Sequence, residues 1–284
     1  MHPFFTKHVF AASLLLMLTV AGAVWAEPAA KDDERAEQAK LRRERLLVEM
    51  RGMADAIRVT DAKSKQAVPR LKKPLFRYNS PTREHQDGTI WAWGGPGRPL
   101  VVMELFSVNT ERTDWIHGCA LTSDRLVEAQ RMGRRIWYPQ QIGAQTRPIP
   151  SAAAPSRNET LRLRQMKQLS RRFRAHEFWG RNNNRFDMRL MVNPVHRYRD
   201  PEQGLVDGAM FLMAHEIEPE VIIMIEAVRQ DDDLAWQYAV TPIGSAEFHI
   251  FLDGDEIYRR DRSPMRTGYP SDPWHSFHFD AVRE

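Results

Sequence analysis

Short apolar segments separated by turn-forming residues dominate the chain after residue 74. PLFRY, TIWAW, PLVVMELFSV and WIHGCALTS follow one another there, and their aromatic and β-branched residues are typical of strands. PLVVMELFSV is apolar at almost every position, which predicts a central strand covered on both faces. GGPGR and NTERTD separate these segments, so we expect an antiparallel meander.

A second series of apolar segments follows the first at a fixed distance along the chain. AMFLMAH, PEVIIMIEAVR and LAWQYAV take the corresponding places, and AEFHIFL, EIYRR and WHSFHFD add further strands. Of the 35 positions from Pro74 to Val108, nine are identical to the residue 120 positions later, where composition alone predicts about two. A one-residue slip then pairs Trp115 with Trp236. An internal duplication is predicted, and the recurring residues include Arg77 and Arg197, Tyr78 and Tyr198, Asp87 and Asp207, and Gly88 and Gly208.

Apolar residues at three- and four-residue spacing predict a helix before each series of strands. The first helix presents Met50 and Ala54 on one face and ends near Ile57. The second covers NETLRLRQMKQLSRRFR, for which Asn158 is a suitable N-cap, and Phe173 lies on its apolar face. A third, short helix is predicted for TSDRLVEAQRMG, which begins with capping residues and ends in glycine.

These elements predict an α+β fold of two tandem repeats, each a helix followed by an antiparallel β-meander, related by pseudo-twofold symmetry. The cleft between the repeats is the expected binding site. The predicted boundaries are a signal peptide at 1–26, a charged N-terminal helix or arm at 27–57, a first repeat at 58–137, a Pro-rich linker at 138–157 and a second repeat at 158–284.

The first 26 residues have the features of a secretory signal peptide. Lys7 and the amino terminus supply a positive start, an uncharged apolar run follows, and the run ends in a small-residue pattern at Ala26. A retained membrane anchor is the alternative, because the run approaches the ~20 residues needed to span a bilayer. Cleavage near Ala26 predicts a periplasmic or secreted protein.

The formal net charge of +4 conceals an uneven distribution. Residues 200–284 hold 18 acidic and 6 basic residues, a net of −12, whereas residues 1–199 hold 19 and 35, a net of +16. The export signal and this division argue against a nucleic-acid partner. They favour attraction between the two halves, with a protein partner or an anionic glycan or lipid surface as the alternative. The single cysteine, Cys119, is expected to be buried.

Recognisable catalytic and metal-binding motifs are missing from the sequence. It has no H-E-x-x-H, G-x-S-x-G, phosphate loop or paired C-x-x-C, and its histidines lack metal-ligand spacing. We therefore predict no metal, no cofactor and no catalytic residue. Asp87 and Asp207 each precede a glycine, which turn geometry explains better than acid–base catalysis. Arg77 and Arg197 are expected to bond the Asp of their own repeat.

One resemblance rests on two separated segments. DGTIWAW at 87–93 precedes Gly97-Arg98-Pro99, and the later Arg-rich helix is followed by AHEF at 175–178. In these features the chain resembles a group of secreted proteins of planctomycete bacteria. The resemblance covers most of residues 74–280; it implies an extracytoplasmic location and carries no activity with it.

The sequence thus favours a secreted binding or interaction module without catalytic activity. The alternative is an extracytoplasmic hydrolase that uses Asp87, Asp207 or Glu226 in a cleft between the repeats. A structural envelope component is a third hypothesis, which predicts an exposed helical arm before residue 46. Aromatic and arginine side chains are frequent in recognition surfaces, so the candidate binding surface consists of Trp91, Trp93, Arg77, Arg197, Asp87 and Asp207.

Overall fold

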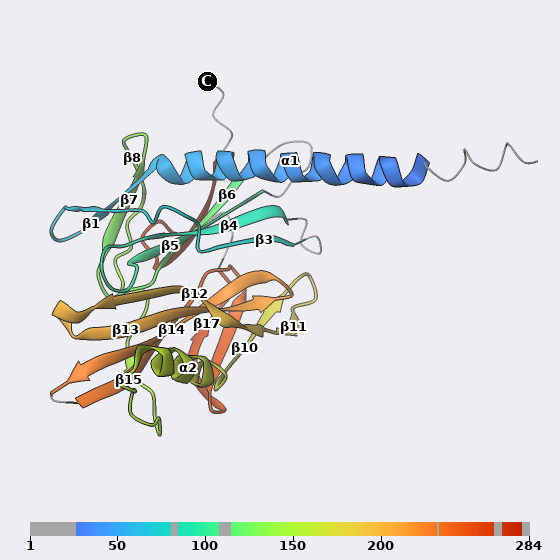
Figure 1. Ribbon diagram of the computed structural model, residues 1–284. Helices are drawn as coiled ribbons and strands as arrows, with labels where there is room; N and C mark the ends of the chain where they lie inside the picture. The colour runs from blue at the N-terminus through green and yellow to red at the C-terminus, as the bar shows by residue number, and fades with distance from the viewer. Residues whose placement is uncertain (1–26, 81–84, 108–114, 232, 264–268, 280–284) are drawn as a thin grey trace, which may run out of the picture. The chain divides into compact units, whose positions relative to one another are not determined.

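The computed structural model describes residues 27–80, 85–107, 115–231, 233–263 and 269–279 (Figure 1). The predicted signal peptide at 1–26 therefore lies outside the described residues. The chain divides into two compact units, the first ending at Val48 and the second running from Glu49 onwards. None of the described helices is long and apolar enough to cross a membrane.

The fold is mostly β, so the predicted α+β class is wrong. Strands make up 52% and helices 17% of the described residues. The predicted repeat unit, a helix followed by one meander, is also wrong, because the strands on each side of the linker are divided between two sheets. The two helices are α1 (Glu27–Asp55) and α2 (Glu159–Ser170), and a 3-10 turn, η2, spans Pro201–Gln203.

Two antiparallel five-stranded sheets form the centre of the larger unit. The first sheet has the strand order β18-β6-β5-β4-β3, and the second has the order β12-β13-β14-β15-β9. The first comprises β3 (Phe76–Ser80), β4 (His85–Trp93), β5 (Val101–Ser107), β6 (Trp115–Leu121) and β18 (Trp274–Phe279). The second comprises β9 (Arg147–Pro148), β12 (Arg189–Asp200), β13 (Leu205–His215), β14 (Glu218–Gln230) and β15 (Asp233–Pro242).

Two four-stranded antiparallel sheets complete the described part of the fold. Their strand orders are β2-β1-β7-β8 and β11-β10-β16-β17. The first contains β1 (Ile57–Asp61), β2 (Ala67–Val68), β7 (Val127–Arg131) and β8 (Arg134–Trp137). The second contains β10 (Phe173–Trp179), β11 (Asn184–Asp187), β16 (Glu247–Leu252) and β17 (Asp255–Arg260).

Residues 120 positions apart hold the same register in the two five-stranded sheets. Trp93 faces Val101 across β4 and β5, and Met213 faces Val221 across β13 and β14. The slip of one residue that pairs Trp115 with Trp236 also has a structural counterpart. Trp115 faces Ser107, and Trp236 faces Ala227.

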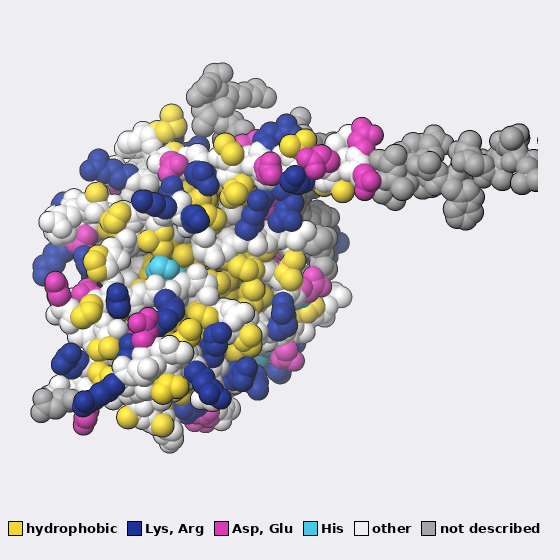
Figure 2. All heavy atoms as spheres, viewed as in Figure 1, with side chains coloured by type: hydrophobic (Ala, Val, Ile, Leu, Met, Phe, Trp, Pro, Cys, Tyr) yellow, Lys and Arg dark blue, Asp and Glu magenta, His cyan; other side chains and the backbone are white. Residues whose placement is uncertain are grey.

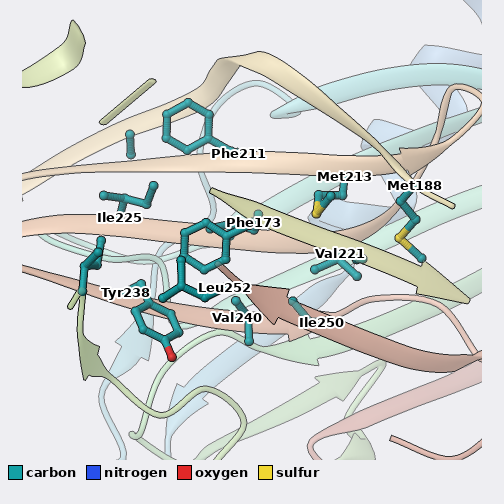
Figure 3. Close-up of a cluster of buried hydrophobic side chains, with 14 of the residues drawn as sticks. Phe173, Met188, Phe211, Met213, Val221, Ile225, Tyr238, Val240, Ile250 and Leu252 are labelled. Atoms are coloured by element: carbon teal, nitrogen blue, oxygen red, sulfur yellow. The ribbon is translucent and has the colours of Figure 1, made fainter. Parts of the chain in front are cut away.

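The apolar residues of β13 and β14 are buried on both faces of the second sheet. Alternate side chains such as Met210 and Ile222 meet Ile90 and Val102 of the first sheet, so the five-stranded sheets pack face to face. The other face carries Phe211 and its neighbours, which pack against β10, β16 and α2 (Figure 3). Figure 1 accordingly shows α2 beyond the second sheet. Side chains in the middle of the layer between the two large sheets are therefore shielded from water.

Most strand predictions match the structure, whereas the third predicted helix is wrong. The segment TSDRLVEAQRMG contains β7, in which Val127 and Ala129 are buried on one face. Two-residue alternation and pairing with β1 outweigh its capping residues. The helix predicted to reach Phe173 also ends earlier, because β10 begins at that residue. Asn158 caps α2 as predicted, since its side chain accepts a hydrogen bond from the Leu161 amide.

The C-terminal strand crosses the predicted repeat boundary. β18 pairs with β6, so Trp274 faces Ala120 and Ser276 faces Gly118. The linker also contributes one short strand, β9, which pairs with β15. Cys119 is buried as predicted, and burial raises the pKa of its thiol. β18 thus forms the edge of the first five-stranded sheet next to β6.

Candidate functional site

The recurring arginine and aspartate residues form an ion pair within each sheet, as predicted. Arg77 Nε donates to Asp87 Oδ1 at 2.8 Å, and Arg197 Nη2 donates to Asp207 Oδ2 at 2.7 Å. Arg162 of the basic helix α2 adds a second donor to Asp207 at 3.0 Å. Both aspartates are buried. Their arginine partners hold them in the sheets, which is a structural role.

The recurring tyrosine and glycine residues form a second matched contact. Tyr78 faces Gly88 and Tyr198 faces Gly208 across neighbouring strands. A Cβ atom on Gly88 would lie 2.4 Å from the Tyr78 ring, and one on Gly208 would lie 2.3 Å from the Tyr198 ring. Only glycine lets either ring lie flat against its neighbouring strand. The contact explains why tyrosine and glycine recur together.

The two tryptophans of the predicted binding surface lie in the interior. Trp91 and Trp93 are 0% and 1% exposed. The Trp91 indole N–H donates to Thr89 Oγ1 at 2.9 Å, and the Arg70 guanidinium lies 4.5 Å from its ring centroid. Both indoles are therefore core groups of the first five-stranded sheet.

One end of the layer between the large sheets holds an arginine whose side chain is only 12% exposed. Arg98, from the loop between β4 and β5, donates from Nε and Nη2 to both oxygens of Glu226 at 2.7 and 2.5 Å. The Tyr198 hydroxyl and the Gln237 amide donate to the same carboxylate at 2.8 and 2.7 Å. Burial opposes ionisation of Glu226, but the bonds from Arg98 outweigh it and lower the pKa. Glu226 therefore stays ionised and paired.

The opposite end of this layer holds a cluster of glutamates instead. The Tyr78 hydroxyl donates to Glu104 Oε1 at 2.5 Å. Burial raises the pKa of Tyr78 far above its usual value, and the charges of Glu104, Glu218 and Glu220 raise it further. All three glutamates are buried, at 5%, 4% and 2% exposure. Tyr78 thus remains a hydrogen-bond donor beside three carboxyl groups.

These glutamates line a cavity of about 350 Å³ where three sheets meet. Its volume lies at the lower end of the ~300–1,000 Å³ typical of ligand pockets. We call it the glutamate cavity. The two large sheets contribute the carboxyl groups, and β10, β11 and β18 contribute aromatic walls. The residues that define it are Glu104, Glu218 and Glu220 together with Trp179, Phe186, His215 and Trp274.

His215 forms one polar corner of the glutamate cavity. Its Nδ1 lies 2.7 Å from Glu177 Oε1, and its ring stacks on Phe186 with centroids 4.4 Å apart. Glu177 is fully buried. The carboxylate therefore fixes the orientation of the imidazole ring, which in turn holds the aromatic wall in place.

Two glycines allow the carboxyl groups close to the backbone. A Cβ atom on Gly244 would lie 1.9 Å from Glu220 Oε2, and one on Gly118 would lie 3.6 Å from Glu104 Oε2. Any side chain at Gly244 would therefore displace the Glu220 carboxyl group. The loop before β16 and the strand β6 are shaped around the two glutamates.

A second cavity of about 470 Å³ lies on the other side of Trp274. The Arg260 guanidinium lies 4.9 Å from the centroids of both Phe248 and Trp274, and it donates to the Gly244 carbonyl. Burial lowers the pKa of Arg260 to about 10, although Tyr258 and Glu220 raise it. Because the Arg260 guanidinium already stacks on two rings and donates to a backbone carbonyl, the second cavity is a weaker candidate ligand site than the glutamate cavity.

The carboxylates proposed for a hydrolase do not meet in one pocket. Asp87, Asp207 and Glu226 each bond an arginine. Glu226 borders an open groove of about 460 Å³, together with Arg98 and Asp200. Among the described residues, no group of three or more His, Cys, Asp or Glu side chains is arranged to hold a metal ion.

Figure 2 shows how the basic side chains are distributed on one face of the molecule. On the face that Figure 2 shows, Lys and Arg side chains are scattered among apolar and acidic groups. Arg162 of α2 is itself buried against Asp207. This face therefore does not distinguish an anionic glycan or lipid from other partners.

The glutamate cavity was not predictable from the sequence. One signal was present, because Glu104 interrupts the otherwise apolar segment PLVVMELF and a charge there must be buried with its strand. Glu218 and Glu220 likewise flank Pro219 at the start of an apolar strand. Their convergence depends on how the two large sheets face each other, which no local pattern reports.

The chain matches no protein-family model, no curated protein and no solved structure.

Proposed function

We propose that this chain is an extracytoplasmic binding protein without catalytic activity, and that its glutamate cavity takes a small organic cation. One observation carries the proposal: three buried glutamates line a cavity with aromatic walls. The Tyr78 hydroxyl donates to one of them, Glu104. The extracytoplasmic location follows from the features of residues 1–26.

Burial of carboxylates favours a positively charged ligand. An ionised carboxylate removed from water is costly unless a cation or hydrogen-bond donors compensate for the lost hydration. Tyr78 supplies one donor to Glu104, and the Arg260 charge acts on Glu220 from beyond Trp274. A ligand cation between Glu104 and Glu218 would add compensation from within the cavity.

The walls favour an organic cation over a metal ion. Mg²⁺ and Ca²⁺ take six or more oxygen ligands in a polar shell. Trp179, Phe186 and Trp274 instead offer aromatic surface, which attracts cations to ring faces and buries alkyl groups. A ligand with a charged head and a short apolar body fits both features.

Calorimetric titration of residues 27–284 with alkylammonium and alkylguanidinium salts tests the proposal. We expect one ligand per chain, weaker binding at high salt because of charge screening, and recovery of the ligand unchanged. The triple variant Glu104→Gln, Glu218→Gln, Glu220→Gln should abolish binding. The matched variant Glu202→Gln, at an exposed position in η2, should bind like the wild type. Absence of binding by the wild type, or unchanged binding by the folded triple variant, would refute a cationic ligand.

A further inference from the structure

We infer that the second cavity binds the carboxylate group of a small organic acid through the Arg260 guanidinium. The cavity, of about 470 Å³, lies within the ~300–1,000 Å³ typical of ligand pockets. Three of its lining side chains, Arg260, Tyr238 and Tyr258, keep hydrogen-bond donors that the described part of the chain does not use. The inference does not depend on the cation proposed for the glutamate cavity.

Arg260 donates only one hydrogen bond to the described residues. Its Nη2 donates to the Gly244 carbonyl, and its guanidinium lies 4.9 Å from the ring centroids of Phe248 and Trp274. Nε is buried without a partner, and Nη1 has no acceptor among the described residues. Stacking on rings uses the faces of a guanidinium and leaves the N–H groups at its edge. The Nη1 edge is therefore the part that a ligand in the cavity can contact.

The Arg260 charge also lacks an ion-pair partner among the described residues. Asp272, which lines the same cavity, forms no ion pair with it. Residues 264–268 lie outside the described residues, and their sequence, PMRTG, holds no acidic side chain. Burial lowers the pKa of Arg260 to about 10, and the electrostatic effects of Tyr258 and Glu220 offset this lowering only in part. A guanidinium that is removed from water without a counter-charge is costly, so an anionic ligand would stabilise it.

Two tyrosine hydroxyl groups add donors to the same cavity. Neither Tyr238 nor Tyr258 forms a hydrogen bond to another described residue through its hydroxyl. Tyr238 is 4% exposed, and Figure 3 shows its hydroxyl pointing away from Phe173, whose ring centroid lies 5.3 Å from its own. Burial raises the pKa of Tyr258, so its hydroxyl stays protonated and can donate. Hydroxyl groups shielded from bulk water lose hydrogen bonds unless a bound water or ligand replaces them.

The lining favours a carboxylate with a short apolar body over inorganic phosphate. A carboxylate has two oxygens, which can accept from a guanidinium and from a hydroxyl group at the same time. Among the described lining residues the charged side chains are Arg147, Arg260 and Asp272, two positive and one negative, a net of +1 that balances one negative charge. Ile257 and Trp274 add apolar surface, which a phosphate ion would leave without a contact.

Calorimetric titration of residues 27–284 with sodium butyrate tests the inference. Butyramide is the matched neutral probe, because it has the same chain length and differs in the charge of its head group. We expect one butyrate per chain, bound at least about tenfold more tightly than butyramide, since the amide loses a charge-assisted hydrogen bond. Butyrate should bind less tightly at high salt because of charge screening, and more tightly than inorganic phosphate at any salt concentration.

Substitutions at Arg260 and Tyr258 locate the bound carboxylate. Arg260→Gln removes the guanidinium and should abolish butyrate binding, and Tyr258→Phe removes one donor and should weaken binding by about tenfold. Arg259→Gln is the matched control, because it removes the same charge at the next residue, whose side chain is 58% exposed, and it should bind butyrate like the wild type. Tyr258→Phe keeps the size of the ring, so it decides the outcome if Arg260→Gln does not fold.

Three results would each overturn the carboxylate site. They are equal affinity for butyrate and butyramide, tighter binding of inorganic phosphate than of butyrate, and unchanged butyrate binding by folded Arg260→Gln or Tyr258→Phe. Absence of butyrate binding by the wild type would have the same consequence. Because butyrate is an anion, none of these results bears on the cation proposed for the glutamate cavity.

Discussion

Single residues in this protein are constrained by how closely a ring or a carboxyl group approaches the backbone. The rings of Tyr78 and Tyr198 occupy the space where Gly88 and Gly208 lack a side chain. Glu220 occupies the corresponding space at Gly244. The predicted turns at Asp87-Gly88 and Asp207-Gly208 are wrong, because both pairs lie within strands, β4 and β13, and neither glycine has a positive φ. The recurring residues instead support each sheet and direct a tyrosine hydroxyl toward a buried carboxylate.

Gly208→Ala should destabilise the larger unit by about 1–3 kcal/mol, because the Tyr198 ring must move out of a packed layer. Urea unfolding monitored by tryptophan fluorescence measures this loss. Gly52→Ala is the control: no atom lies within 4 Å of a Cβ atom there, so the helix should be equally or more stable. Equal stability of Gly208→Ala and the wild type would show that the ring contact does not constrain the fold.

The Arg98–Glu226 ion pair should make the free energy of unfolding depend on pH. The folded pKa of Glu226 is lowered, so its contribution is complete above the unfolded value of about 4.3 and is lost as the pH falls through the folded value. Glu226→Gln leaves Arg98 buried without a counter-charge and should cost about 3–5 kcal/mol at neutral pH. Below pH of about 4 the difference from the wild type should begin to shrink, because the carboxyl group is protonated in the unfolded state first, and it should be smallest once the pH has fallen through the lowered folded pKa. Urea unfolding at both pH values checks this, and a difference that does not change with pH would contradict it.

The observed helices and strands agree better with the apolar pattern of the sequence than with its capping residues. The strands around Val101–Ser107 and Glu218–Gln230 were predictable because their apolar runs are too continuous for an exposed face. β7 was not, because VEAQR has helix-forming residues and becomes a strand only through pairing with β1. β10 was not predicted either, because its sequence follows almost directly after the basic helix α2 and was included in the predicted helix.

The candidate site was predictable only in part, because its residues come from strands of different sheets. Arg77 and Asp87 could be matched from their recurrence, and the structure joins them. Glu218 could not be assigned to a site, because it meets Glu104 through the packing of two sheets rather than through sequence spacing. Recurrence therefore shows which positions correspond, such as Arg98 and Glu218, but not which side chains meet across the two sheets.

β18 should be essential to the cavity even though it lies at the end of the chain. A chain that ends at Arg262 lacks Trp274 and Ser276, which line the cavity and pair with β6. We expect this truncation to lower the melting temperature and to abolish binding of butylguanidinium, because β6 loses its neighbouring strand. A chain that ends at Phe279 is the control and should keep both properties. Full binding by the shorter chain would show that β18 forms no part of the site.

At the scale of the whole molecule, the larger unit places polar groups at the two ends of an otherwise apolar layer. At one end, Arg98 and Glu226 form an ion pair. The other end opens into the glutamate cavity, whose walls come from the two large sheets and one small sheet. Because three sheets contribute, ligand binding should stabilise them together. The melting temperature of the wild type should therefore rise with butylguanidinium concentration, whereas that of the triple variant Glu104→Gln, Glu218→Gln, Glu220→Gln should not.

The most direct measurement is a crystal structure of residues 27–284 grown with butylguanidinium chloride. We expect the cationic group of the ligand to lie beside the carboxyl groups of Glu104 and Glu218, with its alkyl chain against Trp274. A cavity occupied by a side chain of the protein in the presence of saturating ligand, or ligand bound only elsewhere, would contradict it.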